Sequence, residues 1–490
     1  CRCGPADSER RPSVIVGCVG NSLASMWCGC CCSGGRRGAE DALEEPWIKK
    51  EGGDAPGTEE SSPGTGLRMP QRPEQVSSLE PVEAPENHLA RQRPLPEGLT
   101  HVVVDNGSRT IKAGLAVGGG EPSVVMASLV GRERRLSTFV GVDQSARHDI
   151  VVGNEVLSKL SLLTTTSPVH GGLIENNAGT GLRGPQGEAV RLLWRQVLED
   201  ALGHGDCAGR GQDPEEDLDL GDVCLLMTSP VVPDTNREAV LELLFEEFGV
   251  AAVQLHDPAP LELFASGRTS GIAVSCGHER CISVPILDGN IARTGIQLGS
   301  VAGLQLTTTL ASQLAEKGYN SEFASAGSFY LAEAIKERAG FVHSEKLLSH
   351  DLSRASVSPL AAASEQEYTL PDGTAIELGA EVGEFGELLF NPEASDAGRE
   401  LRGLGKLVVD AIEASDPGLN WDFKSTLAAN VVIGGGTTAL RGFDHRLANE
   451  VRALLPSKVQ AQLAITPASE HRDHASFVGA SVVAEFAATA

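Results

Sequence analysis

The feature that most constrains the fold is a strand–turn–strand pattern that occurs twice, about 170 residues apart. In the first copy, the β-branched run 101–104 precedes a short polar turn and a second apolar segment, 111–115. In the second copy, the segments 271–274 and 282–285 flank a turn at 275–280. Strands that alternate with helical segments are typical of α/β proteins. The sequence therefore predicts an α/β fold with a duplicated architecture.

Further elements follow from local patterns. Apolar runs predict buried strands at 223–227 and 430–433, and apolar residues at helical spacing predict helices. A Pro-Asp-Gly turn predicts a hairpin over 368–376. The expected helices are 235–248, 332–338 and 443–455.

Composition excludes several classes of protein. Of the 490 residues, 41% are hydrophobic, which is enough to bury a core and excludes global disorder. The 66 acidic against 40 basic residues give a net charge of -26, which disfavours generic binding to a nucleic-acid backbone. No apolar run approaches the roughly eighteen residues that a membrane span needs.

Two segments, 1–98 and 201–222, differ in composition from the rest of the chain. Seven of the 11 cysteines lie in the first 32 residues, and the rest are scattered, so the body is expected to be reduced and intracellular. The cluster 28–32 fits S-acylation, half of a metal site, or no function. We predict a low-complexity, disordered extension at 1–98, with Met26 or Met69 as alternative starts, and a body at 99–487. Residues 201–222 are expected to form an acidic surface insertion.

Three polar or glycine-rich turns follow apolar strands, at 105–108, 275–280 and 434–438. Glycines let backbone N–H groups approach and bind an anion, although such turns are more often only turns. No P-loop and no dinucleotide fingerprint occurs. A nucleotide site would therefore be a phosphate clamp made of separate hairpins. His471 with His474, and Cys276, are weaker candidates for a metal pair and a nucleophile.

These motifs resemble the actin family. The segment 103–108, followed by 112–114, is similar to the first phosphate loop of actin. Further similar segments follow in the same order and together cover about residues 100–487; they are 152–159, 163–171, 229–238, 265–269, 368–373 and 435–438.

The resemblance implies the actin fold, two pseudo-duplicated α/β domains around a cleft that holds ATP or ADP with Mg²⁺ or Ca²⁺. Gly107, Ser108 and Lys112 would meet the phosphates, Gly277 would sit in the second phosphate loop, and Gly303 would lie near the nucleotide. On the same basis, the residues of the adenosine side would be Lys336, Glu337, Gly435, Gly436 and Thr437.

Departures from actin affect the cation and the attacking water. Ser275 stands where actin has a carboxylate near the cation, which leaves Asp105 to address a metal ion through water. Pro258 and Ile282 replace the glutamine and histidine that act on the water, so no catalytic residue is assigned. Arg109 and Glu279 replace glycines, and Glu279 is expected to repel a phosphate, with Arg280 compensating in part. We expect hydrolysis to be lost and leave nucleotide binding open.

Three functions compete. The first is a divergent actin-related protein that acts as a structural or scaffolding subunit of a cytoskeletal or chromatin-associated complex, with little or no ATP hydrolysis. The alternative is a conventional filament-forming ATPase; a metabolite kinase or chaperone ATPase of the wider superfamily lacks supporting residues. Pro258, Ser275 and Ile282 favour the first, as do the acidic insertion and the divergent loop 134–149. The end of the sequence at Ala490, before actin's last helices, favours it too unless the sequence is truncated there. Partners would be other actin-family or complex subunits in the cytoplasm, the cytoskeleton or the nucleus.

Overall fold

The computed structural model describes residues 98–117, 119–133, 150–174, 184–203, 219–230, 235–319, 323, 327–345, 366–371, 373–392, 401–415, 418 and 421–489. The predicted extension up to residue 97, with its cysteine cluster, lies outside these ranges, and so does most of the predicted acidic insertion. The two ends of that insertion belong to the core, because Ala201 and Leu220 are buried. The surface placement of residues 204–218 stays a prediction.

The first sheet has the strand order β10-β9-β1-β2-β3. The central strand β1 pairs in parallel with β9 and antiparallel with β2, as the first predicted strand–turn–strand pattern requires. β9 and β10 are also parallel, whereas β2 and β3 are antiparallel. The strands are β1 (Thr100–Asn106), β2 (Thr110–Leu115), β3 (Val124–Ala127), β9 (Val223–Thr228) and β10 (Ala252–His256).

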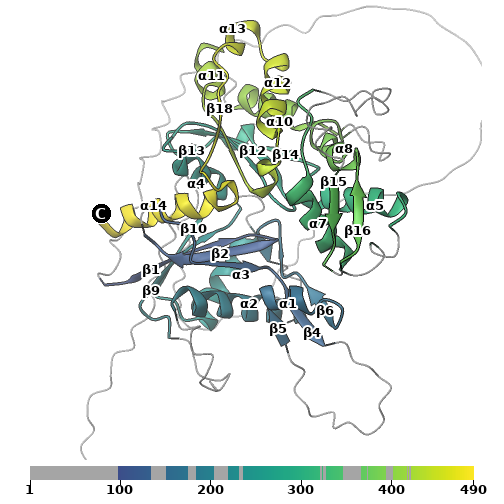
Figure 1. The fold of residues 1–490 in the computed structure, drawn as a ribbon. Helices are drawn as coiled ribbons and strands as arrows, with labels where there is room; N and C mark the ends of the chain where they lie inside the picture. Colours follow the sequence, from purple (N-terminus) through teal and green to yellow (C-terminus); the bar gives the residue numbers. More distant parts are fainter. Residues whose placement is uncertain are drawn as a thin grey trace, which may run out of the picture. The chain divides into compact units, whose positions relative to one another are not determined.

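The second sheet repeats this arrangement around β11, with the order β13-β12-β11-β17-β18 and β14 paired to β12. β11 pairs in parallel with β17 and antiparallel with β12, so it corresponds to β1 of the first sheet. The prediction of a duplicated α/β architecture is confirmed (Figure 1). The strands are β11 (Gly271–Cys276), β12 (Cys281–Leu287), β13 (Asn290–Ile291), β14 (Gln297–Gly299), β17 (Val431–Gly434) and β18 (Ile465–Pro467).

Three small sheets complete the strands. They are β4 (Val130–Glu133) between β5 (Ile150–Val152) and β6 (Leu163–Thr166), β7 (Val169–His170) with β8 (Leu173–Ile174), and β15 (Gln366–Thr369) with β16 (Ala375–Leu378). The last pair is the predicted hairpin, with Tyr368 opposite Ile376.

Helices pack on each sheet separately. The helices associated with the first sheet are α1 (Asn154–Ser158), α2 (Pro185–Ala201) and α3 (Thr235–Glu242). α3 continues as a π-helical turn, Leu243–Glu247, where the sequence predicted one regular helix. Those on the second sheet are α5 (Gly303–Glu316), α7 (Ser328–Ala339), α8 (Glu381–Glu384), α9 (Glu387–Phe390), α10 (Leu404–Ala414), α11 (Trp421–Ala428), α12 (Phe443–Leu454) and α13 (Ser457–Gln460).

Two helices connect the sheets. α4 (Pro258–Ala265) and α14 (Ala475–Thr489) pack against each other, and α14 also contacts β1 (Figure 1). Leu261 of α4 joins a buried cluster with Val103 of the first sheet. Ala259 and Leu263 of α4 instead pack with residues of the second sheet. α4 therefore reaches both sheets at the point where their polar turns lie.

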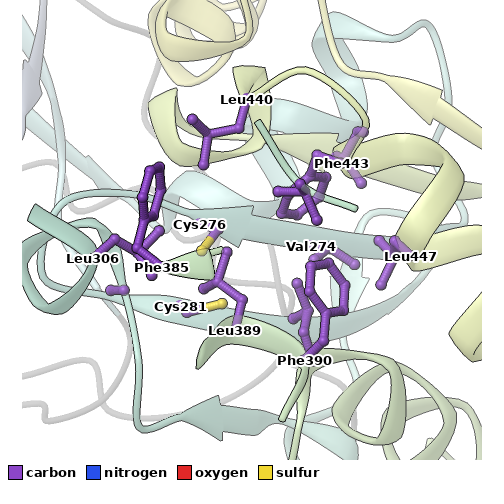
Figure 2. Packing of buried hydrophobic residues seen from close by; sticks show 14 of the residues in the cluster. Val274, Cys276, Cys281, Leu306, Phe385, Leu389, Phe390, Leu440, Phe443 and Leu447 are labelled. Carbon is purple, nitrogen blue, oxygen red and sulfur yellow. The ribbon is translucent and has the colours of Figure 1, made fainter. Parts of the chain in front are cut away.

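The largest apolar cluster among the described residues lies between the second sheet and its helices. Figure 2 shows Val274 and Cys276 of β11 beside Cys281 of β12, with Leu306, Phe385 and Phe443 packed around them. Burial of these side chains stabilises the fold by roughly 25 cal/mol for each Å² of apolar surface removed from water. No helix in the described part of the chain combines the length and apolar character of a membrane span.

Candidate functional site

The turn between β1 and β2 is held by a buried hydrogen-bond network centred on Thr228, the last residue of β9. Its hydroxyl donates to Oδ1 of Asp105 at 2.9 Å and accepts the backbone N–H of Asn106 at 2.8 Å. The indole N–H of Trp194, from α2, donates to Oδ1 of Asn106 at 3.1 Å. Nζ of Lys112 lies 3.4 Å from Oδ2 of Asp105. Sequence reasoning missed Thr228 and Trp194, because no local pattern brings them to this turn.

The turn between β11 and β12 is anchored to two other segments. The N–H of Gly277 donates to the carbonyl of Arg280 at 2.8 Å, which closes the turn. The carbonyl of Gly277 then accepts the N–H of Gly303 at 3.0 Å and the hydroxyl of Thr437 at 2.8 Å. The start of α5 and the turn after β17 therefore hold the second loop in place.

A cavity of about 500 Å³ lies between these turns. Its volume is in the range typical of small-molecule sites. Gly303 is not among its lining residues, since it supports the second loop from behind. The other predicted site residues all line the cavity: Asp105, Gly107, Ser108, Lys112, Gly277, Lys336, Glu337, Gly435, Gly436 and Thr437.

Two of the lining glycines are required by the backbone alone. A Cβ at Gly107 would lie 2.4 Å from the carbonyl oxygen of Thr110, inside van der Waals contact. Gly435 has φ 84°, and a Cβ there would lie 2.5 Å from the carbonyl oxygen of Cys276. The fold explains these glycines without any ligand.

Two other glycines are not required in this way. A Cβ at Gly277 would meet nothing closer than the carbonyl oxygen of Arg280 at 3.7 Å. At Gly436 the nearest atom would be Cβ of Asp473, also at 3.7 Å. A side chain would fit at both positions but would occupy space next to the cavity. These glycines keep open a cradle of the kind that a nucleotide would fill.

The end of the cavity assigned to adenosine carries a buried ammonium group. Nζ of Lys336 donates to the hydroxyl of Thr307 at 2.7 Å and to the carbonyl of Gly303 at 3.3 Å. Burial lowers the pKa of Lys336, whereas burial and the nearby charge of Glu333 raise the pKa of Glu337. These bonds set Lys336 in place, and hydroxyl groups of a ligand would find a donor in Lys336 and an acceptor in the exposed Glu337.

The opposite end contains a buried carboxyl group that sequence reasoning missed. Oε1 of Glu262, on α4, accepts the hydroxyl of Ser275 at 2.7 Å and that of Ser476 at 3.2 Å. Oε2 is buried without a hydrogen-bond partner in the described ranges. Burial raises the pKa of Glu262 to about 8, so it is protonated at neutral pH. Its sequence signal was a single acidic residue within the otherwise apolar segment 258–265.

This end fits a divalent cation poorly. The prediction left Asp105 as the only carboxylate, and the structure adds two more carboxyl groups in the same cavity, those of Glu262 and Asp257, of which Asp257 caps α4. Asp105 is already bonded to Thr228 and Lys112, and Glu262 is neutral. Mg²⁺ and Ca²⁺ prefer several charged oxygen ligands. Among the described residues, no group of three or more His, Cys, Asp or Glu side chains is placed to hold a metal ion.

Comparison with known proteins agrees with this geometry. A sequence model of the actin family matches residues 97–489, which is most of the chain. The chain belongs to the actin family. A curated relative, an actin-like protein of Neurospora crassa, is 29% identical over 385 residues, covering 78% of this chain and 90% of the relative. The predicted family and the α/β actin-like fold are confirmed.

The structure also places Pro258 and Ile282, which the resemblance to actin predicts to be at the hydrolytic positions. Pro258 is the first residue of α4, and the Asp257 carboxylate caps the helix by accepting the N–H of Ala259 at 3.0 Å. Ile282 lies on β12 and is 6% exposed. Both line the cavity, and neither side chain has a polar atom.

The expectation for Glu279 is wrong. Its carboxylate does not face the phosphate side but turns to the β7–β8 hairpin. Oε2 accepts the backbone N–H of Gly171 at 2.7 Å, and Oε1 lies 3.2 Å from Nδ1 of His170. The carboxylate is therefore held by partners in another segment, and Glu279 is not among the residues that line the cavity. Arg280 remains at the cavity wall, where burial lowers its pKa.

The weaker candidates are not assembled as chemical sites. The rings of His471 and His474 are 5.6 Å apart, but Nδ1 of His474 contacts Oε2 of Glu121 at 2.5 Å. The thiol of Cys276 is buried beside Cys281 (Figure 2). Contact with the Cys281 thiol and burial raise the pKa of Cys276 well above its usual value, which disfavours a nucleophilic thiolate.

Proposed function

We propose that this actin-family chain is a structural or scaffolding subunit of a cytoskeletal or chromatin-associated complex, in which the cleft holds ATP or ADP with little or no hydrolysis. The observation that carries the proposal is the pair Pro258 and Ile282 at the cavity wall. Hydrolysis needs a group that orients the attacking water or accepts its proton. A pyrrolidine ring and an aliphatic side chain do neither.

Nucleotide binding is supported by the cavity itself. Gly277 and Gly436 leave open space that packing does not require, and Lys112 and Lys336 provide positive charge at the two ends. The cation side is weaker, because Asp105 is engaged and Glu262 is neutral. A retained nucleotide would then act as a ligand that binds both halves of the molecule. Asp105 could contact a metal ion only through water, and because it is bonded to Thr228 and Lys112 such a contact would add little to binding.

Two experiments separate this role from that of a filament-forming ATPase. In the first, purified protein is placed in physiological salt with Mg²⁺-ATP and sedimented. We expect the protein to remain in the supernatant, whereas pelleting as filaments would contradict the scaffold role. In the second, tagged protein is purified with its partners from cells. We expect to recover defined subunits, and their identity would show whether the complex is cytoskeletal or chromatin-associated. Recovery of the protein without complex subunits would count against the scaffold role.

A further inference from the structure

We propose that two side chains, Arg109 and Glu279, hold the cleft of this protein closed by direct contacts across it, whether or not a nucleotide is bound. By the resemblance to actin, both positions carry a glycine there. A glycine has no side chain, so it cannot make such a contact across the cleft. The inference goes beyond the proposed function, because it concerns the two halves of the protein and not the ligand.

The two halves are defined by their cores. The first half is the sheet around β1, and its buried cluster includes Val169 and Ile174 of the β7–β8 hairpin. The second half is the sheet around β11, and its buried cluster includes Ala332 and Ile335 of α7. A contact between the β1–β2 turn and α7, or between the β11–β12 turn and the β7–β8 hairpin, therefore joins the halves.

The first bridge starts from Arg109 in the β1–β2 turn. Its guanidinium lies 2.6 Å from Oε2 of Glu333, on α7. The Glu333 side chain is only 6% exposed, so this contact is largely shielded from water. The guanidinium also lies over the ring of Tyr330, 5.0 Å from its centroid, which adds a cation–π contact from the same helix. Nδ1 of His278 approaches the other oxygen of Glu333 at 3.7 Å.

The second bridge runs in the opposite direction. Glu279, in the β11–β12 turn of the second half, binds the N–H of Gly171 at 2.7 Å and contacts His170 at 3.2 Å. The Glu279 side chain is 19% exposed. A carboxylate that accepts a backbone N–H makes a stronger hydrogen bond than a neutral acceptor does.

The two bridges are reciprocal, since each half sends one charged loop residue into the other. Opening the cleft would break both at once and leave Glu333 and Arg109 without their partners in a partly buried place. Separating such a pair is unfavourable, because each charge loses its partner before it regains full hydration. In this arrangement the protein supplies contacts that a bound nucleotide would otherwise have to supply.

The test uses hydrogen–deuterium exchange of the full-length protein, followed in peptides that cover 169–174 and 328–339. In the variant Arg109→Gly we expect faster exchange not only in the α7 peptide but also at the Gly171 amide. The increase at Gly171 should be about tenfold, the size expected when a hydrogen bond to a charged group is weakened. Glu279→Gly should conversely speed exchange in α7.

A matched control is Lys317→Ala, which removes an ion pair with Glu381 at 2.9 Å inside the second half. This variant should leave the 169–174 peptide unchanged. If Arg109→Gly also leaves that peptide unchanged, the two contacts are local and the proposal is overturned. If Arg109→Gly does not fold, Glu333→Gln, which removes the charge and keeps the shape, is used with the same criteria.

A second arm uses the unmodified protein before and after removal of nucleotide with apyrase and EDTA. We expect the same exchange in both peptides. Faster exchange after removal would mean that the nucleotide, not the two bridges, closes the cleft. If the protein binds no nucleotide, the proposed function fails, but the coupling between the two bridges in the variants is still expected.

Discussion

The hydroxyl of Ser275 on β11 donates a 2.7 Å hydrogen bond to Oε1 of Glu262 on α4, between the two sheets. By the resemblance to actin, the residue that corresponds to Ser275 of this chain is a carboxylate near the cation. Here the carboxyl group lies on a neighbouring helix, where burial raises its pKa to about 8. With a serine at position 275 and a protonated Glu262, these two positions carry no negative charge at neutral pH.

This protonated carboxyl group predicts a specific pH dependence of stability. The pKa of Glu262 rises from an ordinary 4.5 to about 8 on folding, so its contribution is fully present below about pH 4.5 and is lost as the pH rises through 8. The full contribution is at most about 5 kcal/mol, from 1.36 kcal/mol for each unit of pKa. Denaturant unfolding between pH 5 and about 9 should show a flatter curve for Glu262→Gln. If the free energies of unfolding of the unmodified protein and of Glu262→Gln change with pH in parallel, Glu262 is charged in the folded protein.

A second prediction concerns the buried guanidinium of Arg446 on α12. It binds both carboxylate oxygens of Glu387, at 2.6 and 2.8 Å, and Oε1 of Glu450 at 2.9 Å. Arg446→Met should cost about 3–5 kcal/mol, because it leaves the partly buried carboxylate of Glu387 without its partner. The control Arg132→Met breaks an exposed ion pair with Glu188 and should cost less than about 1 kcal/mol. Equal losses in Tm for the two variants would contradict the assignment.

A third prediction separates the two kinds of glycine. Gly435→Ala should lower the free energy of unfolding by about 2 kcal/mol or more, because its φ is 84° and its Cβ would contact Cys276 at 2.5 Å. Gly436→Ala should change stability by less than about 1 kcal/mol but weaken nucleotide binding. Thermal unfolding and ATP titration measure the two effects. An unchanged ATP affinity in Gly436→Ala would show that the open space at this residue does not serve the nucleotide.

The cation side supplies a fourth prediction. Since Asp105 is bonded to Thr228 and Lys112, and Glu262 is protonated, Mg²⁺ should add little to nucleotide affinity. We expect the Kd for ATP to change by less than about threefold when EDTA replaces Mg²⁺. In a variant with the other three tryptophans replaced by Phe, the fluorescence of Trp194, which is hydrogen-bonded to Asn106, is a local probe for this titration. A loss of ATP binding in EDTA would contradict this and show that the site depends on a metal ion.

The sequence predicts those parts of the fold that depend on local patterns. The strand pairs around 105–108 and 275–280 follow from apolar runs broken by polar turns, and the structure has them as β1–β2 and β11–β12. The order of motifs along the chain also predicts the family. Contacts between distant segments are different, because Arg109 and Glu333 are 224 residues apart and no local rule pairs them.

The same limit explains the errors at the site. Glu279 was expected to face a phosphate because its loop was considered alone, but Gly171 offers it an N–H from a hairpin 108 residues away. Glu262 was overlooked because one acid in an apolar helix gives no motif. Its hydrogen bonds to Ser275 and Ser476 exist only after α4 has packed against β11 and against α14. Burial and partner choice are properties of the packed chain, and they decide the charge of the site.

The most direct test of the account is a single-turnover measurement of ATP bound in the cleft, in Mg²⁺ and at neutral pH. After removal of free nucleotide, the bound fraction is quenched over time and separated into ATP, ADP and phosphate. With Pro258 and Ile282 at the cavity wall, we expect the bound nucleotide to be recovered as intact ATP. Stoichiometric release of phosphate that requires Mg²⁺ and is abolished by Ser108→Ala would contradict it.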